Sequence, residues 1–483
     1  RIRSLGPGEA VLASFRDVVS EIRAAGKDVI AYLPNGADNR ALFLASAARL
    51  VLVGPETTVA PVGYAAVGRY LRRALAHAGI EPEIFARGTY KSAGEALVRD
   101  GMSDAEREQV SAIVAARYDA LVAALAQGRR VDRATAAGWI DAAPHTSREA
   151  VKLGLVDGTA YEDELEGKIA RPLKLVAAAR YLKRRSSGRL RPLRPRRVLG
   201  VVEVHGPIVS RARIDIGGLA SEDRVVASLR AARADRRVAG VVLHVDSPGG
   251  SAVASDRIHR EVRRLAEVKP VVAYLSNVAA SGGYYVAAGA HAIVAQPQTI
   301  TGSIGVVAAR FVVGPLLQRL GVNVDVVKRG AHADMFDVTR HFDGEERAQF
   351  ERELDAFYER FLAVVAEGRR REVDAIRPLA EGRVYAGGDA HDRRLVDLLG
   401  GFDRAVHELR VLVGPEARGL EPRIVRARRK IPPPAMPATA PGPAVMAALR
   451  ALAPAAGLDR LPDALLLALH LEGERALLYY PGV

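Results

Sequence analysis

The 483-residue chain contains no cysteine, which excludes disulfide bonds, thiolate metal sites, iron–sulfur clusters and a cysteine nucleophile. Aromatic residues make up only 5% of the sequence, so few side chains are available to stack on nucleic-acid bases. No stretch reaches the roughly 18 consecutive apolar residues of a membrane span, and no signal peptide is visible. The motifs H-E-x-x-H, G-x-S-x-G and S-x-x-K are also absent. We therefore expect no bound metal and none of the hydrolase classes that use these motifs.

Lysine is scarce in a strongly basic chain. The formal net charge is +14, yet only nine of the 70 basic residues are lysine. The positive charge favours anionic partners such as acidic lipid headgroups or nucleic acid. Because arginine does not deprotonate in proteins, a lysine retained in such a chain is a candidate for a role that needs the neutral amine.

The most informative feature of the sequence is an internal repeat. When the sequence is shifted by 242 residues, Lys27–Lys91 aligns without a gap on Lys269–Ala333, and 17 of these 65 positions are identical. Further along, AVKLGLVDG (150–158) aligns with AHDRRLVDL (390–398) after a slip of two residues. The pattern predicts a duplicated domain rather than a short-period solenoid.

Each repeat alternates strand-like and helix-like segments. The runs 198–208 and 238–250 are β-branched and lead into glycine, 251–268 has an amphipathic helical period, and 269–276 is again strand-like. This alternation predicts an α/β fold, with a mostly parallel sheet and surrounding helices in each repeat.

The repeats divide the chain into four parts: an N-terminal repeat over 1–170, a basic linker over 171–197, a C-terminal repeat over 198–412, and a basic, proline-rich stretch with a tail over 413–483. Residue 1 aligns with about residue 243. The N-terminal repeat thus lacks a counterpart of 198–242, and we expect the natural chain to begin upstream. After Leu182 the linker carries eight basic residues and no acid or aromatic. It is either a solvated hinge or a polybasic contact with anionic lipid, and nucleic acid is not an expected partner.

Four segments carry residues suited to catalysis: VDSPGG (245–250), NVAASGGYY (277–285), TGSIG (301–305) and RGTYKSAGEAL (87–97). The first three combine glycine turns, which expose backbone N–H groups, with the serines Ser281 and Ser303. The fourth contains Lys91. Taken alone, each segment is weak evidence for catalysis, because a serine in a glycine-rich string is more often part of a turn or a helix start, and a lone lysine is usually a solvated charge.

Comparison of the repeats connects these segments. Ser281 aligns with Asn39, and Lys91 aligns with Ala333, so each repeat retains what the other lacks. One composite site at the interface between the repeats would explain this pattern. A serine hydroxyl needs a base during attack, and lysine can act as that base if burial lowers its pKa. A role for His244 as the base, beside Asp246 on the same strand, remains the alternative.

Together, VDSPGGS, NVAASGGYY, TGSIG and RGTYKSAGE resemble the long, duplicated form of bacterial signal peptide peptidase A (protease IV). The resemblance covers about residues 5–412. It implies tandem Clp-protease/crotonase-like domains and a Ser–Lys dyad, with Ser281 as nucleophile and Lys91 as general base. It further implies that Ser303 orients the lysine and that Gly250 and Gly282 supply the oxyanion-hole amides.

The resemblance also implies a homotetramer, anchored in the bacterial inner membrane and facing the periplasm, that acts on cleaved signal peptides. The anchor, the arginine-rich linker and the tail are where this sequence departs from the family pattern. We therefore expect a serine endopeptidase that degrades hydrophobic peptides without cofactor or metal. A crotonase-type acyl-CoA enzyme and a non-catalytic membrane scaffold on the same fold are the alternatives.

Overall fold

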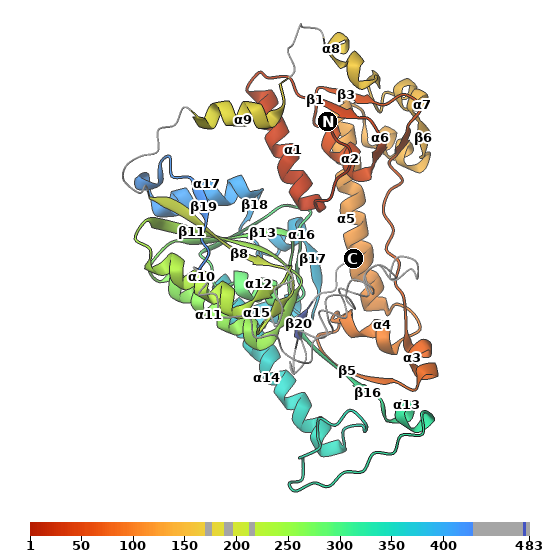
Figure 1. Ribbon diagram of the computed structural model, residues 1–483, viewed down its shortest axis with the longest axis vertical. Helices are drawn as coiled ribbons and strands as arrows, with labels where there is room; N and C mark the ends of the chain where they lie inside the picture. The colour runs from red at the N-terminus through yellow and green to blue at the C-terminus, as the bar shows by residue number, and fades with distance from the viewer. Residues whose placement is uncertain (170–175, 188–196, 212–217, 428–476, 480–483) are drawn as a thin grey trace.

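The computed structural model describes residues 1–169, 176–187, 197–211, 218–427 and 477–479. The two repeats lie side by side, and each has a hydrophobic core of its own (Figure 1). Their seam continues into a narrow extension at the bottom of the view, which both repeats build.

The N-terminal repeat is mainly helical. Its helices are α1 (Glu9–Ala24), α2 (Asn39–Ala45), α3 (Arg72–Ala78), η1 (Ser92–Gly94), α4 (Glu95–Val98), α5 (Asp104–Arg129), α6 (Arg133–Asp141), α7 (Ser147–Lys152), η2 (Glu162–Glu164) and α8 (Leu165–Lys168). Its strands are β1 (Ile30–Leu33), β2 (Ala37–Asp38), β3 (Leu50–Val53), β4 (Thr58–Ala60), β5 (Glu81–Arg87), β6 (His145–Thr146) and β7 (Gly158–Thr159).

The C-terminal repeat follows helix α9 (Ala178–Ser187). Its strands are β8 (Val198–His205), β9 (Ile208–Val209), β10 (Ala220–Ser221), β11 (Val238–Ser247), β12 (Gly249–Ser251), β13 (Val271–Ala280), β14 (Ala292–Ala295), β15 (Ile300–Gly302), β16 (Val306–Val312), β17 (Val384–Ala386), β18 (Leu398–Leu399), β19 (Pro422–Ile424) and β20 (Leu477–Tyr479). Its helices are α10 (Glu222–Ala234), α11 (Ala252–Ala266), α12 (Gly282–Ala287), α13 (Gly314–Arg319), α14 (Gly344–Arg369), α15 (Val373–Ile376), η3 (Arg377–Leu379), α16 (Gly387–Asp392), α17 (Phe402–Val413) and η4 (Pro415–Ala417).

The duplication is visible in the strand registers. Ile30 of β1 pairs with Leu50 of β3, and Val272 of β13, 242 residues later, pairs with Ala292 of β14. The β2–β4 pair matches the β13–β15 pair in the same way, and β4–β6 matches β15–β17. The two repeats therefore share the pairing pattern of these strands.

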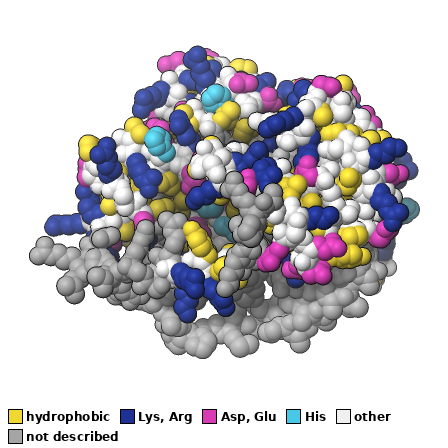
Figure 2. Space-filling model, turned by 90° about the horizontal axis from the view of Figure 1, so that it is seen from above, with side chains coloured by type: hydrophobic (Ala, Val, Ile, Leu, Met, Phe, Trp, Pro, Cys, Tyr) yellow, Lys and Arg dark blue, Asp and Glu magenta, His cyan; other side chains and the backbone are white. Residues whose placement is uncertain are grey.

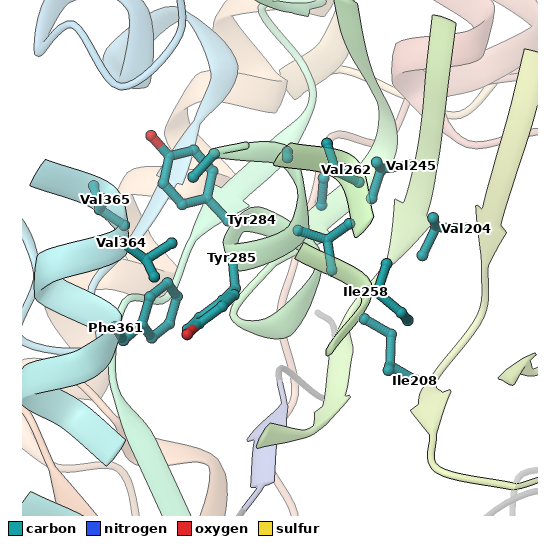
Figure 3. Packing of buried hydrophobic residues seen from close by; sticks show 14 of the residues in the cluster. Val204, Ile208, Val245, Ile258, Val262, Tyr284, Tyr285, Phe361, Val364 and Val365 are labelled. Carbon is teal, nitrogen blue, oxygen red and sulfur yellow. The ribbon is translucent and has the colours of Figure 1, made fainter. Parts of the chain in front are cut away.

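The C-terminal repeat is built around an eight-stranded sheet in the order β17-β15-β13-β11-β8-β19, with β14 and β18 branching from β13. Its central strands β11 and β13 are buried along most of their length, as expected for parallel strands covered on both faces. Helices α10, α11 and α12 share one hydrophobic core, whereas α17 packs on the other face with Val242 and Tyr274. Tyr285 of α12 packs against Phe361 of α14, with ring centroids 4.9 Å apart, as Figure 3 shows. This packing fixes α12, whose first turn follows Ser281.

The two repeats are joined by a two-stranded antiparallel pairing at the seam. Strand β5 of the N-terminal repeat pairs with β16 of the C-terminal repeat over seven residue pairs, from Val306 with Arg87 to Val312 with Glu81. Lys91 follows β5, and Ser303 precedes β16. Backbone pairing between the repeats thus sets the relative position of these two residues.

Two segments differ from the sequence-based expectations. Part of the linker forms helix α9, because the run AARYLKRR lacks helix-breaking residues before the serines and Gly188. The sheet of the C-terminal repeat also extends past residue 412, where β19 pairs in parallel with β8 at its edge. Most of the proline-rich stretch and of the tail lie outside the described residues.

Candidate active site

Ser281 lies at the junction between β13 and α12. Its backbone has φ +55° and ψ −119°, a region that non-glycine residues rarely occupy, and its side chain is fully buried. The Ser281 N–H donates to the carbonyl of Gly302 at 2.8 Å, which fixes the strained turn. Such strain at a sharp strand-to-helix turn is typical of a residue that must present its side chain in one orientation.

Lys91 reaches Ser281 from the other repeat. It lies directly before the 3₁₀ helix η1 and is only 5% exposed. Its Nζ lies 2.8 Å from Ser281 Oγ, 2.9 Å from Ser303 Oγ and 3.0 Å from the Ser303 carbonyl oxygen. The structure therefore brings together the three side chains that the repeat comparison and the family resemblance singled out.

Burial lowers the pKa of Lys91 to about 7 because the ammonium form loses its hydration. No carboxylate opposes this shift, so about half of the amine is neutral at pH 7 and most of it is neutral above that pH. A neutral amine has two N–H donors and one lone pair. Two donors match the two oxygen atoms of Ser303, and the lone pair is then available to accept from the Ser281 hydroxyl.

Ser303 is also held in a strained conformation. Its φ is +54°, and its N–H donates to the carbonyl of Arg383 at 2.7 Å. It lies between β15 and β16. On its N-terminal side β15 pairs with β13, and on its C-terminal side β16 pairs with β5 of the other repeat. Ser303 is thus positioned by both repeats.

Gly250 and Gly282 flank Ser281 on two different elements. Gly250 in β12 has φ +150°, and a Cβ there would lie 2.0 Å from the carbonyl oxygen of Ile208, so only glycine fits. Gly282 is the first residue of α12, and its N–H has no acceptor within the helix. Both amides belong to backbone segments beside the serine, which is a suitable place to bind a developing negative charge.

A segment of the C-terminal repeat packs against residues 88–92, the loop that carries Lys91 and is called the lysine loop below. Tyr90 N–H donates to the carbonyl of Glu381 at 2.7 Å. The next residue is Gly382, where a Cβ would lie 2.6 Å from the Cβ of Lys91. The two backbones approach so closely that a side chain at residue 382 would displace the lysine.

His244 lies elsewhere in the sheet. Its ring packs against Tyr274 and Phe402, with centroids 5.4 and 6.2 Å apart, and burial lowers its pKa. Asp246 accepts hydrogen bonds from the Asn277 side chain and the Val278 N–H. Within the part of the chain that the structure describes, no hydrogen bond joins His244 to Ser281, and Lys91 alone occupies the position of a base.

Sequence reasoning missed two residues that contact the lysine loop. Glu381 accepts from the backbone N–H and the hydroxyl of Thr89, and Gln109 contacts Tyr90 and Ser92. Neither belongs to a motif. Only the fold brings them beside Lys91.

Comparison with known proteins identifies the family. Residues 21–176 and 263–415, together more than half of the chain, match the model of peptidase family S49. The chain belongs to this family. The expected α/β fold with duplicated Clp-protease-like domains is thereby confirmed, as is the resemblance that the four motifs indicated.

Individual relatives agree with this assignment. The chain is 29% identical over 420 residues to the protein named serine protease SPPA, chloroplastic, of Arabidopsis thaliana, covering 84% of this chain and 61% of that protein. It is 31% identical over 400 residues to protease 4 of Salmonella typhi, covering 80% and 64%. It is also 37% identical over 183 residues to the putative signal peptide peptidase SppA of Enterococcus faecium, covering 38% and 53%. The chain thus spans less than two thirds of the length of these relatives.

The buried amine predicts a pH-dependent stability. The pKa of Lys91 is about 7 in the folded state and about 10.5 in the unfolded state, so the unfolded chain binds more protons between these values. Burial of this lysine therefore costs folding free energy, and the cost grows as the pH falls from 10.5 to 7. Replacing Lys91 with methionine removes the penalty, and Lys91→Met is expected to raise the free energy of unfolding at pH 7 by up to roughly 4–5 kcal/mol.

Urea denaturation at pH 7, 8.5 and 10 measures this effect. The difference between Lys91→Met and wild type should shrink steadily as the pH rises. The same substitution at the exposed Lys152, Lys152→Met, provides the control. A difference that stays constant with pH would show that the Lys91 pKa is not depressed.

Proposed function

We propose that the protein is a serine endopeptidase in which Ser281 and Lys91 form the catalytic dyad. The observation that carries this proposal is the 2.8 Å contact between Lys91 Nζ and Ser281 Oγ at a site closed from solvent. Membership of peptidase family S49 and the relatives named as proteases support the same activity.

The reaction uses the groups of the dyad in order. Neutral Lys91 accepts the hydroxyl proton while Ser281 Oγ attacks the scissile carbonyl, which gives a tetrahedral intermediate. Lys91 then donates that proton to the leaving amine, and an acyl-enzyme remains. A water molecule, deprotonated by the same amine, hydrolyses the ester and regenerates the serine. Throughout, Ser303 holds the amine through two hydrogen bonds.

The amides of Gly250 and Gly282 bind the oxyanion of the tetrahedral intermediate in this proposal. The N–H of Ser281 is already bonded to Gly302, so it is not available for this role. A single oxyanion donor contributes about 3–4 kcal/mol to transition-state stabilisation. A side chain at residue 250 would clash with Ile208, which ties this donor to glycine.

We propose that substrates bind as an added strand beside β12. The short strand β20 of the same chain supports this mode. It pairs antiparallel with β12, Gly250 opposite Leu478, and also with β16 through Val307 and Leu477. An extended segment therefore fits between these strands, bonded through its backbone next to the dyad.

Removal of this strand should free the groove. Deletion of residues 477–483 is expected to lower the KM for a hydrophobic peptide severalfold and to leave kcat within about twofold, because a tethered segment competes at high effective concentration. Deletion of residues 480–483 alone keeps β20 and serves as the control. Steady-state kinetics of both truncations measure the effect, and an unchanged KM in the longer deletion would argue against binding at β12.

For the substrate we propose signal peptides and similar hydrophobic peptides, as the name of the Enterococcus faecium relative suggests. From the resemblance to signal peptide peptidase A, we also propose a location at the bacterial inner membrane with the site facing the periplasm. Among the described helices, α5 is long and apolar enough to span a membrane by length and composition, but Leu121 and Leu125 on it are buried in the core. Basic side chains are spread among acidic ones on the face in Figure 2, so lipid attraction there would be diffuse.

The crotonase-type and scaffold alternatives have less support. A crotonase-type enzyme needs the oxyanion amides but not a buried serine–lysine contact. A scaffold needs neither. Burial of the amine lowers the stability of the folded state, and a scaffold gains nothing in return for that loss.

Peptide hydrolysis by Ser281→Ala and Lys91→Ala tests the dyad. Each variant is expected to lose at least about 10³-fold in kcat, and the double variant should lose no more than either single variant, because the two residues act as one unit. In wild type, kcat/KM should rise with pH through an apparent pKa near 7, as the amine becomes neutral. Full activity of folded Ser281→Ala would disprove the mechanism, and activity of Lys91→Ala alone would direct attention to another base.

We further propose that copies of the chain assemble head to tail into a closed ring, a homotetramer by the family resemblance. The internal duplication supports this. The counterpart of β5 is 323–329 and that of β16 is 64–70, and neither segment forms a strand in the structure. Val67 is 82% exposed, and Val326 is 46% exposed. The two segments are therefore expected to pair between neighbouring copies as β5 pairs with β16 within one copy.

A cysteine crosslink tests this pairing directly. The register of β5 with β16 places Val67 opposite Val326 of the next copy, at a distance that a disulfide can bridge. Since the chain has no cysteine, Val67→Cys/Val326→Cys is expected to give a ladder of oxidised species that ends at the number of copies in the ring. Each single variant is the control. Only monomer after oxidation, with the protein folded, would contradict the assembly.

A further inference from the structure

Lys91 occupies a short irregular segment, so local structure alone does not fix its side chain. Its backbone has φ −79° and ψ +65°, outside any regular element, and only the three-residue helix η1 follows. A general base must lie within hydrogen-bond reach of its serine during attack, and a shift of about 1 Å can reduce the rate about 100-fold. Contacts from outside the loop must therefore hold it.

Gln109 on α5 contacts the residues on both sides of Lys91. Its Nε2 donates to the Tyr90 carbonyl oxygen at 3.0 Å and to Ser92 Oγ at 3.0 Å. Its Oε1 accepts from the N–H of Val384 at 3.2 Å. The side chain is 5% exposed, so these partners replace water for the amide.

The third contact connects the lysine loop to the strand that holds Ser303. Val384 begins β17, which pairs with β15 through Gly302, and the preceding carbonyl, that of Arg383, accepts from the Ser303 N–H. The side-chain amide of Gln109, in the N-terminal repeat, thus bonds to the lysine loop and also to β17, the strand of the C-terminal repeat that pairs with β15 just before Ser303.

Comparison of the repeats shows that this arrangement is specific to one of them. Gln349 lies 240 residues after Gln109, the spacing that also relates the matching ion pairs Arg129–Asp157 and Arg369–Asp397. Gln349 is exposed on α14, whereas Gln109 is buried. The same residue type therefore has a buried, bonded position only in the repeat that carries the lysine.

We propose that Gln109 is a positioning residue that holds Lys91 in register with Ser281 and Ser303 by bridging the lysine loop to β17. Without the amide, the loop keeps its bond from Tyr90 to Glu381 but loses its link to β17, and it then moves enough for water to reach the lysine amine. The amine then becomes better solvated, and it is protonated at a higher pH than in wild type. This proposal rests on the proposed peptidase function, but its effect on Lys91 exists without turnover.

The variant Gln109→Met keeps the length of the side chain and removes all three hydrogen bonds. We expect kcat to fall about 10- to 100-fold with KM changed less than about threefold, because substrate contacts β12 and not Gln109. The apparent pKa of the acidic limb of the pH–rate profile should rise by one pH unit or more. Gln109→Glu, which cannot donate to Tyr90 when ionised, is expected to show the same loss at alkaline pH.

Two matched glutamines provide the controls. Gln296 is 3% exposed and also bridges the repeats, through Ser14 and Asp17 of α1, but it does not contact the lysine loop. Gln349 is exposed at the equivalent position. Gln296→Met and Gln349→Met should keep wild-type kcat and pH profile. If Gln109→Met and Gln296→Met lose kcat equally and neither moves the pH limb, Gln109 only joins the repeats and the proposal is wrong.

A second measurement does not depend on catalysis. Competitive acetylation with acetic anhydride across pH, read for the Lys91 peptide by mass spectrometry, reports the pKa of the amine in Ser281→Ala and in Ser281→Ala/Gln109→Met. We expect the pKa to be higher in the double variant. An equal pKa in both folded proteins overturns the proposal. Failure of wild type to cleave any peptide would overturn the peptidase function and leave this measurement valid.

Discussion

The burial of one amine is the constraint on which the rest of the site depends. Lys91 can act as a base at neutral pH only if it is removed from water, and this removal lowers its pKa to about 7. The shift corresponds to a loss of roughly 4–5 kcal/mol of stability at neutral pH relative to an ordinary lysine. Only interactions that exclude water from the amine and hold its loop can maintain this state.

These interactions are mostly backbone to backbone and cross between the repeats. The seven residue pairs of β5 with β16 bring the lysine loop beside Ser303. Glycine at residue 382 then allows the loop to pack against the other repeat at a distance that a side chain would prevent. Because backbone pairing tolerates many side chains, the seam can keep its geometry while the surrounding sequence of the two repeats diverges.

Comparison of the repeats in the sequence singled out two residues of the candidate site, but not the strand pairing that brings them together. Ser281 and Lys91 were found because each is absent at the aligned position of the other repeat, and such a comparison needs no structure. The α/β class followed from the alternation of strand-like and helix-like runs, and family S49 bears it out. The pairing of β5 with β16 could not be predicted, because the two strands lie more than 200 residues apart and the sequence of each is equally compatible with pairing inside its own repeat. Gln109 was missed for a related reason: Gln349 has the same local sequence pattern, and only tertiary contacts bury one and expose the other.

In the proposed ring, the duplicated chain forms two similar interfaces, and only one of them holds the Ser281–Lys91 contact. A seam between a lysine-bearing and a serine-bearing repeat forms within the chain, and the reverse seam, with Ala333 and Asn39, can form only between copies in the proposed ring. That second seam carries no buried amine, so none of the stability lost at Lys91 is lost there. Exposed valines such as Val67 and Val326 are available there for packing between copies. Under the proposed dyad and ring, the presence of Ala333 and Asn39 in place of lysine and serine at the second interface separates catalysis from assembly.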